Sequence, residues 1–144
     1  MAAEIRVLRA EDAAVLDDVA RGVFDDRLDR SATREFLADP RHHLVVAIDA
    51  NVVVGFVSAV HYVHPDKPSP ELWINEVSVV PTHQGQGIGK ALIAATLAVA
   101  RNLGCSEAWV LTDVDNDAAM RLYESGGGTA TRDHVMFTFP LRAS

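Results

Sequence analysis

The chain passes from an apolar strand into a helix through Val77-Ser78-Val79-Val80-Pro81-Thr82-His83-Gln84-Gly85-Gln86-Gly87-Ile88-Gly89-Lys90. Its three glycines stand at alternating positions, where the missing Cβ atoms let a ligand approach the backbone. The first amides of the following helix have no partner within that helix, and the positive end of the helix dipole lies beside them. The stretch therefore predicts a cradle for phosphate groups.

The glycine spacing excludes two common phosphate loops. A Rossmann loop requires a third glycine where Lys90 stands, and a Walker loop requires Ser or Thr where Ala91 stands. The pattern Gln84-x-x-Gly87-x-Gly89 instead resembles the acyl-CoA pyrophosphate loop of the GNAT N-acetyltransferases. A glycine-rich turn that binds no ligand is the alternative.

The length and composition of the chain predict a single domain. The 144 residues are 49% hydrophobic, which is enough for one core but not two. We therefore expect a single soluble α/β domain over residues 1–144. We expect it in the cytoplasm, because the N-terminal stretch lacks a leader pattern and no apolar run would span a membrane. Cys105 is the one cysteine and excludes an internal disulfide, and the histidines lack a metal-ligand spacing, so no metal is expected.

The net charge of -7 narrows the class of partner. Nucleic-acid phosphates require surfaces rich in Lys and Arg, so general affinity for nucleic acid is not expected. The charge favours cationic partners instead.

Apolar periodicity and turn residues predict the order of elements. Strands are expected over residues 5–9, 44–48, 52–60, 71–79, 107–112 and 135–139, and helices over 13–24, 31–37, 88–103 and 118–124. A turn at 49–51 joins the second and third strands. This order is similar to that of the GNAT fold along nearly the whole chain. The resemblance implies a mixed central sheet, splayed between its fourth and fifth strands, with flanking helices.

The resemblance also implies acetyl-CoA as the cofactor. Loop amides would hold its pyrophosphate, namely those of Gln84, Gly85, Gln86, Gly87, Ile88 and Gly89. Lys90 would be either a phosphate partner at the rim or a solvated helix residue. The pantetheine arm would pair with main-chain groups along Val77-Ser78-Val79, and the Val77 amide would stabilise the developing oxyanion. Asn116 would contact the same arm, or cap the helix after it.

Two side chains are the candidates for proton transfer. Tyr123 stands where the resembled enzymes carry a tyrosine near the thiol sulfur, which implies a general acid; a tyrosine that only packs under the cofactor is the alternative. Glu76 interrupts an apolar strand and is expected to share a face with Leu72, Ile74 and Ser78. Apolar surroundings disfavour the charged form of a carboxylate, which makes Glu76 the candidate base. An exposed glutamate without a role is the alternative.

Acidic residues on three segments predict a socket for a polycationic amine. They are Asp25, Asp26, Glu71, Asp113, Asp115 and Asp117, together with Glu76. Several carboxylates can orient a substrate with several amines through charge-assisted hydrogen bonds. A scattered, solvated surface is the alternative for any one of them.

A narrower resemblance concerns the substrate. The strand Glu71-Leu72-Trp73-Ile74-Asn75-Glu76, the segment His83-x-x-Gln86-Gly87-Ile88 and the loop Thr112-Asp113-x-Asp115-Asn116-Asp117 look like those of small aminoglycoside 3-N-acetyltransferases. This likeness implies that the protein transfers an acetyl group from acetyl-CoA directly to the antibiotic in a ternary complex. Such a reaction would give antibiotic resistance.

Three departures and several alternatives accompany this likeness. Glu76 stands in place of the usual aspartate, Gln84 in place of a frequent arginine, and Gly126-Gly127-Gly128 in place of a Gly-aromatic pair. The alternatives are another small amine, a protein N-terminus, or an acyl-CoA-binding module without turnover. A homodimer is common in the family, and the segment 135–139 would pair or pack across such an interface, or serve as an ordinary core strand.

Overall fold

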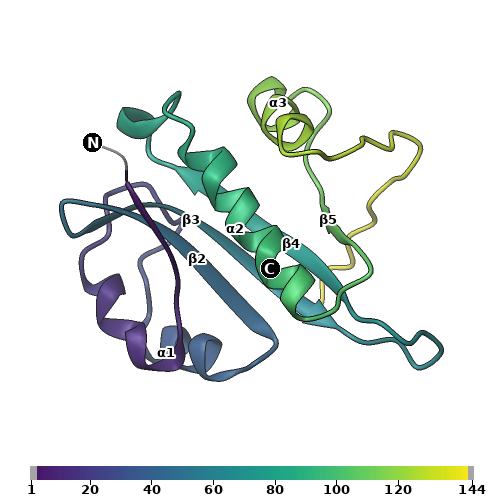
Figure 1. Ribbon diagram of the computed structural model, residues 1–144, viewed down its shortest axis with the longest axis horizontal. Helices are drawn as coiled ribbons and strands as arrows, with labels where there is room; N and C mark the ends of the chain where they lie inside the picture. Colours follow the sequence, from purple (N-terminus) through teal and green to yellow (C-terminus); the bar gives the residue numbers. More distant parts are fainter. Residues whose placement is uncertain (1–2, 143–144) are drawn as a thin grey trace.

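A five-stranded mixed sheet forms the centre of the molecule. The computed structural model describes residues 3–142 (Figure 1). In order across the sheet, the strands are β1 (Glu4–Val7), β2 (His42–Asp49), β3 (Val52–Tyr62), β4 (Glu71–Val79) and β5 (Ala108–Val110). The first four are antiparallel to their neighbours, and β5 is parallel to β4. This is the expected α/β class.

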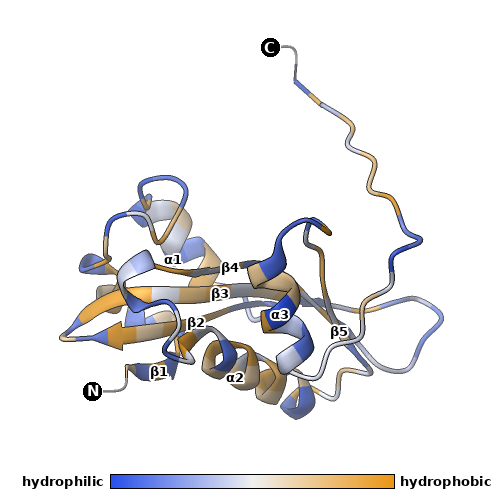
Figure 2. Cartoon of the chain, turned by 90° about the horizontal axis from the view of Figure 1, so that it is seen from above, coloured by the Kyte–Doolittle hydropathy of each residue, from blue (hydrophilic) through white to orange (hydrophobic). Residues whose placement is uncertain are grey.

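Helices cover both faces of the sheet. They are the 3-10 helices η1 (Ala10–Asp17) and η2 (Pro81–His83) and the α-helices α1 (Arg30–Ala38), α2 (Ile88–Asn102) and α3 (Asp117–Ser125). Figure 2 shows α1 and α2 on opposite sides of the sheet. The α2 and α3 helices were both expected, within one or two residues of their observed bounds.

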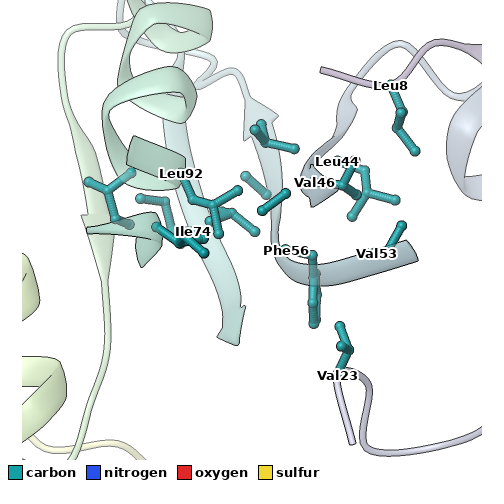
Figure 3. Close-up of a cluster of buried hydrophobic side chains, with 14 of the residues drawn as sticks. Leu8, Val23, Leu44, Val46, Val53, Phe56, Ile74 and Leu92 are labelled. Carbon is teal, nitrogen blue, oxygen red and sulfur yellow. The ribbon is translucent and has the colours of Figure 1, made fainter. Parts of the chain in front are cut away.

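The main core lies between α2 and the sheet. Leu92 of α2 is fully buried and lies beside Ile74 of β4, whereas Phe56 of β3 points toward Val23 on the other face of the sheet and stacks on Phe24 (Figure 3). Gly55 lets α2 and β4 approach, since a Cβ there would lie 2.9 Å from the Ser78 carbonyl oxygen and 3.3 Å from a Leu92 methyl. The resulting packing fixes the start of α2 above β4.

The β2–β3 hairpin confirms its predicted turn. Ala50 and Asn51 form a two-residue loop with φ angles of 50° and 66°. Positive φ at both central residues is typical of the type I′ turns that join tightly paired strands.

A β-bulge interrupts the pairing of β3 with β4. Ser58 lies opposite Glu76, while Ala59 lies opposite Ile74, so Asn75 is the extra residue on β4. An extra residue reverses which face the following side chains occupy. The pairing of β4 with β5 also ends at Ile74. The two strands therefore separate at the bulge, which is where the resemblance places the splay.

The bulge corrects the expected surroundings of Glu76. Leu72 and Ile74 are buried before the bulge, and Val77 packs against the core after it. Asn75 and Glu76 are exposed between them. Glu76 therefore lies on the face opposite Leu72 and Ile74 and is not enclosed by them, because the simple alternation assumed from sequence breaks at one residue.

The predicted helix over residues 13–24 is wrong. A 3-10 helix ends at Asp17, after which the chain pairs with the start of β3. The Val53 N–H donates to the Asp18 carbonyl at 2.8 Å, and the Ala20 N–H donates to the Val53 carbonyl at 2.9 Å. These hydrogen bonds use backbone groups of Asp18 and Ala20 that would otherwise pair within a helix. Gly22 then turns the chain with a φ of 89°.

The predicted strand over residues 135–139 is also absent. Within residues 3–142, no strand pairs with this segment, and its large side chains are exposed. Figure 2 shows it running outward from the body of the molecule. Its composition favours a strand, but a strand forms only where a neighbour supplies hydrogen-bond partners. Residues 1–2 and 143–144, including the Met1-Ala2 part of the stretch judged to lack a leader, lie outside the described residues.

Candidate active site

The start of α2 forms an open cradle. Gly87 precedes the helix with a φ of 81°, no side chain caps the helix, and the first bond runs from the Ala91 N–H to the Gly87 carbonyl. A Cβ at Gly85 or Gly87 would meet no atom within 4 Å, so both glycines border open space. The amides of Ile88, Gly89 and Lys90 precede the first intrahelical bond, and an anion there would also meet the helix dipole. The predicted phosphate loop is therefore open, and its amides are without partners in the helix.

Three contacts hold this loop in place. The His83 Nε2 lies 2.7 Å from an Asp49 carboxylate oxygen at the end of β2. The Gln84 side-chain amide donates to the Val79 carbonyl at 2.9 Å, so the Val79 oxygen expected to meet the pantetheine arm already accepts one bond. Gly89 packs against Leu122 of α3, where its absent Cβ would lie 3.3 Å from a methyl. The loop is therefore tied to the hairpin, to β4 and to α3.

A cavity of about 280 Å³ lies where β4 and β5 separate. It brings together six residues that the sequence analysis assigned to the site: Asp25, Glu76, Val77, Ser78, Asn116 and Tyr123. Asn75 and Thr112 also line it and were not expected. Asn75 could have been found only by locating the bulge, for which the sequence carries no clear signal.

Tyr123 reaches this cavity from α3. Burial raises the pKa of the Tyr123 phenol above its ordinary value, so the hydroxyl keeps its proton at neutral pH. The end of α3 is a Schellman motif, in which the Gly128 N–H donates to the Tyr123 carbonyl and the Gly127 N–H to the Glu124 carbonyl. Gly127 has the required positive φ of 100°. The Gly126-Gly127-Gly128 run thus ends the helix that carries Tyr123.

Asn116 begins the same helix. Its side-chain oxygen accepts the Ala119 N–H at 3.1 Å, which is the capping role weighed in the sequence analysis. The residue lines the cavity as well, so capping and contact with a ligand are compatible.

The acidic residues gather only in part. Asp25 lines the cavity, and Asp113, Asp115 and Asp117 are exposed around the start of α3, close to Asn116. Glu71 lies elsewhere, at the beginning of β4, five residues or about 16 Å along the strand from Glu76.

Glu71 belongs to a second polar cluster. One carboxylate oxygen lies 2.8 Å from the His64 Nε2, and the other accepts the Tyr62 hydroxyl at 3.2 Å. The Trp109 indole donates to the same hydroxyl at 2.7 Å. Glu71 is thus engaged by neighbours at the far end of β4.

A larger groove of about 980 Å³ adjoins the first cavity, between η1 and α1. Asp25 lines both, and Asp26 lines the groove alone. Four arginines also line the groove and were not expected from the sequence: Arg21, Arg27, Arg30 and Arg34. Arg30 lies 3.7 Å from Asp17 in an ion pair. The groove therefore carries both signs of charge and is not purely acidic.

Neither a candidate metal-binding cluster nor a membrane-spanning helix occurs in the described part of the chain. Between residues 3 and 142, no three His, Cys, Asp or Glu side chains are grouped so that they could hold a metal ion. Over the same residues, no helix has both the length and the hydropathy needed to cross a bilayer.

Residues 10–127 match the family model described as the Acetyltransferase (GNAT) family. The chain belongs to this family. GNAT proteins are acetyltransferases that use acetyl-CoA. The predictions of family, fold class, enzyme class and cofactor are therefore confirmed at the level of the family.

The GNAT relatives bear the names of different acetyltransferases. The chain is 32% identical over 104 residues to N-acetyltransferase 8 of Rattus norvegicus, covering 72% of this chain and 47% of the relative. It is 39% identical over 105 residues to a mycothiol acetyltransferase of Kocuria rhizophila, and the match covers 69% of this chain and 33% of that relative. It is 32% identical over 105 residues to the N-alpha-acetyltransferase RimI of Mycobacterium tuberculosis, and the match covers 73% of this chain and 63% of that relative. The matches span between one third and just under two thirds of these relatives.

Solved GNAT structures share the fold along nearly the whole chain. The aminoglycoside acetyltransferase meta-AAC0020, from an uncultured soil metagenomic sample, has a TM-score of 0.82 and 25% identity over 97% of both chains. The aminoglycoside N-acetyltransferase AAC(6')-Iy, in complex with a bisubstrate analogue of CoA, has a TM-score of 0.78 and 20% identity. The match covers 97% of this chain and 99% of that one. The 3-N subtype receives no support from these neighbours.

Proposed function

We propose that this protein is an acetyl-CoA-dependent N-acetyltransferase that acts on a polycationic small amine, an aminoglycoside being the leading candidate and its 3-amino group the expected position. One observation carries the proposal: Glu76 and Tyr123 line the same cavity, where β4 and β5 separate. Such an enzyme needs a held cofactor, a base for the amine and an acid for the departing thiolate, and each has a candidate here.

Backbone groups of this chain would hold the cofactor. The amides at the start of α2 would bind its pyrophosphate, and β4 main-chain groups after the bulge would pair with its arm, because β5 no longer pairs with β4 there. Bound acetyl-CoA supplies the activated acetyl group. The Val77 amide would donate a hydrogen bond to the carbonyl oxygen as it gains negative charge. Gln84 would share or release the Val79 carbonyl when the arm binds.

Proton transfer would be divided between two elements. Glu76 is exposed at the cavity wall, where it can accept a proton from an incoming ammonium group directly or through water. Burial raises the pKa of Tyr123, so the phenol is protonated at neutral pH and would be the group that gives a proton to the departing thiolate. Because β4 carries the base and α3 carries the acid, the substrate amine and the thioester would lie between them.

The charges around the cavity support a cationic acceptor. Asp25, Glu76 and the exposed Asp113, Asp115 and Asp117 lie on the three segments that border the cavity. Carboxylates on several sides can orient a substrate that carries more than one ammonium group. Asp26 would act from the adjoining groove, and Glu71 would act only on a substrate long enough to reach the far end of β4.

A protein N-terminus or another small amine is the second candidate. The observation that favours it is the row of arginines in the adjoining groove, which would attract the carboxylates of an acidic peptide. The RimI and mycothiol acetyltransferase relatives are named for substrates other than aminoglycosides.

The decisive experiment measures acetyl-CoA-dependent thiol release with gentamicin, kanamycin, spermidine and a peptide with a free N-terminus. Fast release with an aminoglycoside alone supports the leading candidate, and mass fragmentation of the product then identifies the acetylated nitrogen. Turnover with the peptide alone supports the second. No turnover with any acceptor, together with a raised Tm in acetyl-CoA, would favour a binding module.

A double variant tests the acidic face directly. Asp113→Asn with Asp115→Asn should raise KM for a polycation far more than KM for a monoamine, because only the former uses several carboxylates. Asp66→Asn, an exposed aspartate in the β3–β4 loop, is the matched control and should change neither value. Equal effects on both substrates would remove the socket from the proposal.

A further inference from the structure

A pair of stacked tryptophans lies on the sheet outside the hydrophobic core. Trp73 of β4 pairs in register with Trp109 of β5, and the two rings stack with centroids 5.3 Å apart and planes 10° apart. Both side chains are partly exposed. The α2 helix packs on the opposite face of β4, where Ile74 is buried, and α1 packs on β2. Neither of these helices therefore covers the two rings.

Polar neighbours fix the orientation of this pair and place a carboxylate beside it. The Trp109 indole donates to the Tyr62 hydroxyl at 2.7 Å, and that hydroxyl donates to Glu71 at 3.2 Å. Burial raises the pKa of the Tyr62 phenol, and the negative charges of Glu71 and Glu107 raise it further, so the hydroxyl keeps its proton. The second Glu71 oxygen lies 2.8 Å from the His64 Nε2.

The Glu71 carboxylate has capacity for another donor. An ionised carboxylate has about four acceptor positions on its two oxygens, and each Glu71 oxygen has one partner here. The side chain is also 15% exposed, so a ligand can reach it. Glu71 can therefore accept a further hydrogen bond without losing the contacts that hold it.

The chemistry of this surface favours a cation. The face of an indole ring carries negative potential, and tryptophan is the best aromatic partner for an ammonium group. Stacking occupies only one face of each ring. The carboxylates of Glu71 and Glu107 are both close enough to act on Tyr62 beside the rings. Such a surface attracts an organic ammonium group and repels an anion.

The tryptophan pair lies on the same face of the sheet as Glu76. Three β4 residues pair in order with alternate residues of β3, namely Glu76 with Ser58, Trp73 with Val60, and Glu71 with Tyr62. Alternate residues of a strand share one face, so their three partners do as well. Two residues of a strand span about 7 Å, which places Trp73 about 7 Å from Glu76 and Glu71 one such step further. A carboxylate, an aromatic pair and a second carboxylate thus follow one another along the face.

We infer that the Trp73–Trp109 pair and the Glu71 carboxylate form a second cation site, which binds an additional ammonium group of a polyamine acceptor. The inference rests on the proposed function in one respect, because the ammonium group to be acetylated would lie at Glu76. An acceptor whose ammonium groups are separated by about 7 Å would occupy both places, whereas a monoamine would occupy only one. The second site would therefore select for polyamines by lowering their KM.

Tryptophan fluorescence tests the second site without any turnover, because the chain has only two tryptophans and both belong to it. At constant ionic strength, spermine should change their emission in a saturable way. Glu71→Gln should weaken this binding about 10-fold, since it removes a charge-assisted contact and keeps both rings. Trp73→Leu should weaken it about 5-fold, with Trp109 as the remaining reporter.

Glu11→Gln is the matched control. It removes an exposed carboxylate from η1 and changes the net charge by the same amount as Glu71→Gln. We expect it to bind spermine as the native protein does. Equal weakening by the two variants would show that spermine responds only to net charge, and this would overturn the inference.

Steady-state kinetics separate this inference from the proposed function. Glu71→Gln should raise KM for spermine several-fold more than KM for hexylamine, a monoamine. Saturable binding through the tryptophans without turnover of any acceptor would support the second site and contradict the proposed activity. Turnover of polyamines by a protein whose emission does not respond to spermine would overturn the second site and leave the proposed activity standing.

Discussion

Replacing Gly128 by alanine tests whether the end of α3 positions Tyr123. A Cβ at Gly128 would lie 2.9 Å from the Tyr123 carbonyl oxygen, where ordinary van der Waals contact begins at 3.4 Å. The two groups must therefore separate by about 0.5 Å. The same oxygen accepts the Gly128 N–H at 2.9 Å, so the shift also weakens a hydrogen bond worth about 1 kcal/mol. We expect a stability loss of about 1–2 kcal/mol, or roughly 3–6 °C in Tm.

The effect on catalysis should exceed the effect on cofactor binding. A 1 Å misplacement of a catalytic group costs about 100-fold in rate, so a shift half as large should lower kcat by about 10-fold. KM for acetyl-CoA should change little, because the α2 cradle is untouched. The assay is thiol release with the best acceptor from the substrate screen, alongside thermal unfolding.

Gly104→Ala is the matched control. Gly104 has a φ of 78° and no atom within 4 Å of a Cβ, so alanine there strains the backbone by about 1 kcal/mol without a clash. It follows α2, roughly 20 Å along that helix from the cradle. We expect a lower Tm with unchanged kcat. An unchanged kcat in Gly128→Ala would refute positioning of Tyr123 by the motif, and so would an undiminished effect of Gly128→Ala on a Tyr123→Phe background.

Three further outcomes follow from the site and the sheet. Glu76→Gln should lower kcat by about 100-fold or more and leave calorimetric acetyl-CoA affinity near that of the native protein, whereas a native rate would remove Glu76 as the base. Asp49→Asn should raise KM for acetyl-CoA several-fold at constant kcat, because it weakens the contact with His83 that holds the loop; an unchanged KM would show that the loop needs no such anchor. Burial lowers the pKa of His43 from 6.5 to about 4, so the unfolded chain takes up the proton first and native stability should fall as pH drops from 6.5 to 4. His43→Gln should flatten that decline in thermal unfolding, and equal slopes would contradict the assignment.

Local chemistry made the hairpin and the main helix predictable. Asn51 tolerates the left-handed conformation that a two-residue turn requires, and Gly104 ends α2 in a Schellman motif through the Cys105 N–H and the Ala100 carbonyl. Both signals act within a few residues and need no tertiary partner. The glycine loop belongs to the same class, because its shape depends on the positive φ angles of Gly85 and Gly87.

The features that sequence reasoning missed depend on distant partners. The apolar spacing of residues 13–24 is helical, but Val53 of β3 captures the backbone of Asp18 and Ala20. The bulge at Asn75 is visible only in the register of β4 against β3. The segment 135–139 has the composition of a strand, yet a strand also needs an edge.

The bulge reverses which residues of β4 face the core. Even-numbered residues face the core before it and odd-numbered residues after it, so Asn75, Glu76 and Ser78 border the cavity within four positions of one another. A regular strand would present only every second residue there. The side chains that line the cavity at these positions can therefore be replaced while Ile74 and Val77 keep their places in the core, so one extra residue separates the lining of the cavity from the interior of the protein.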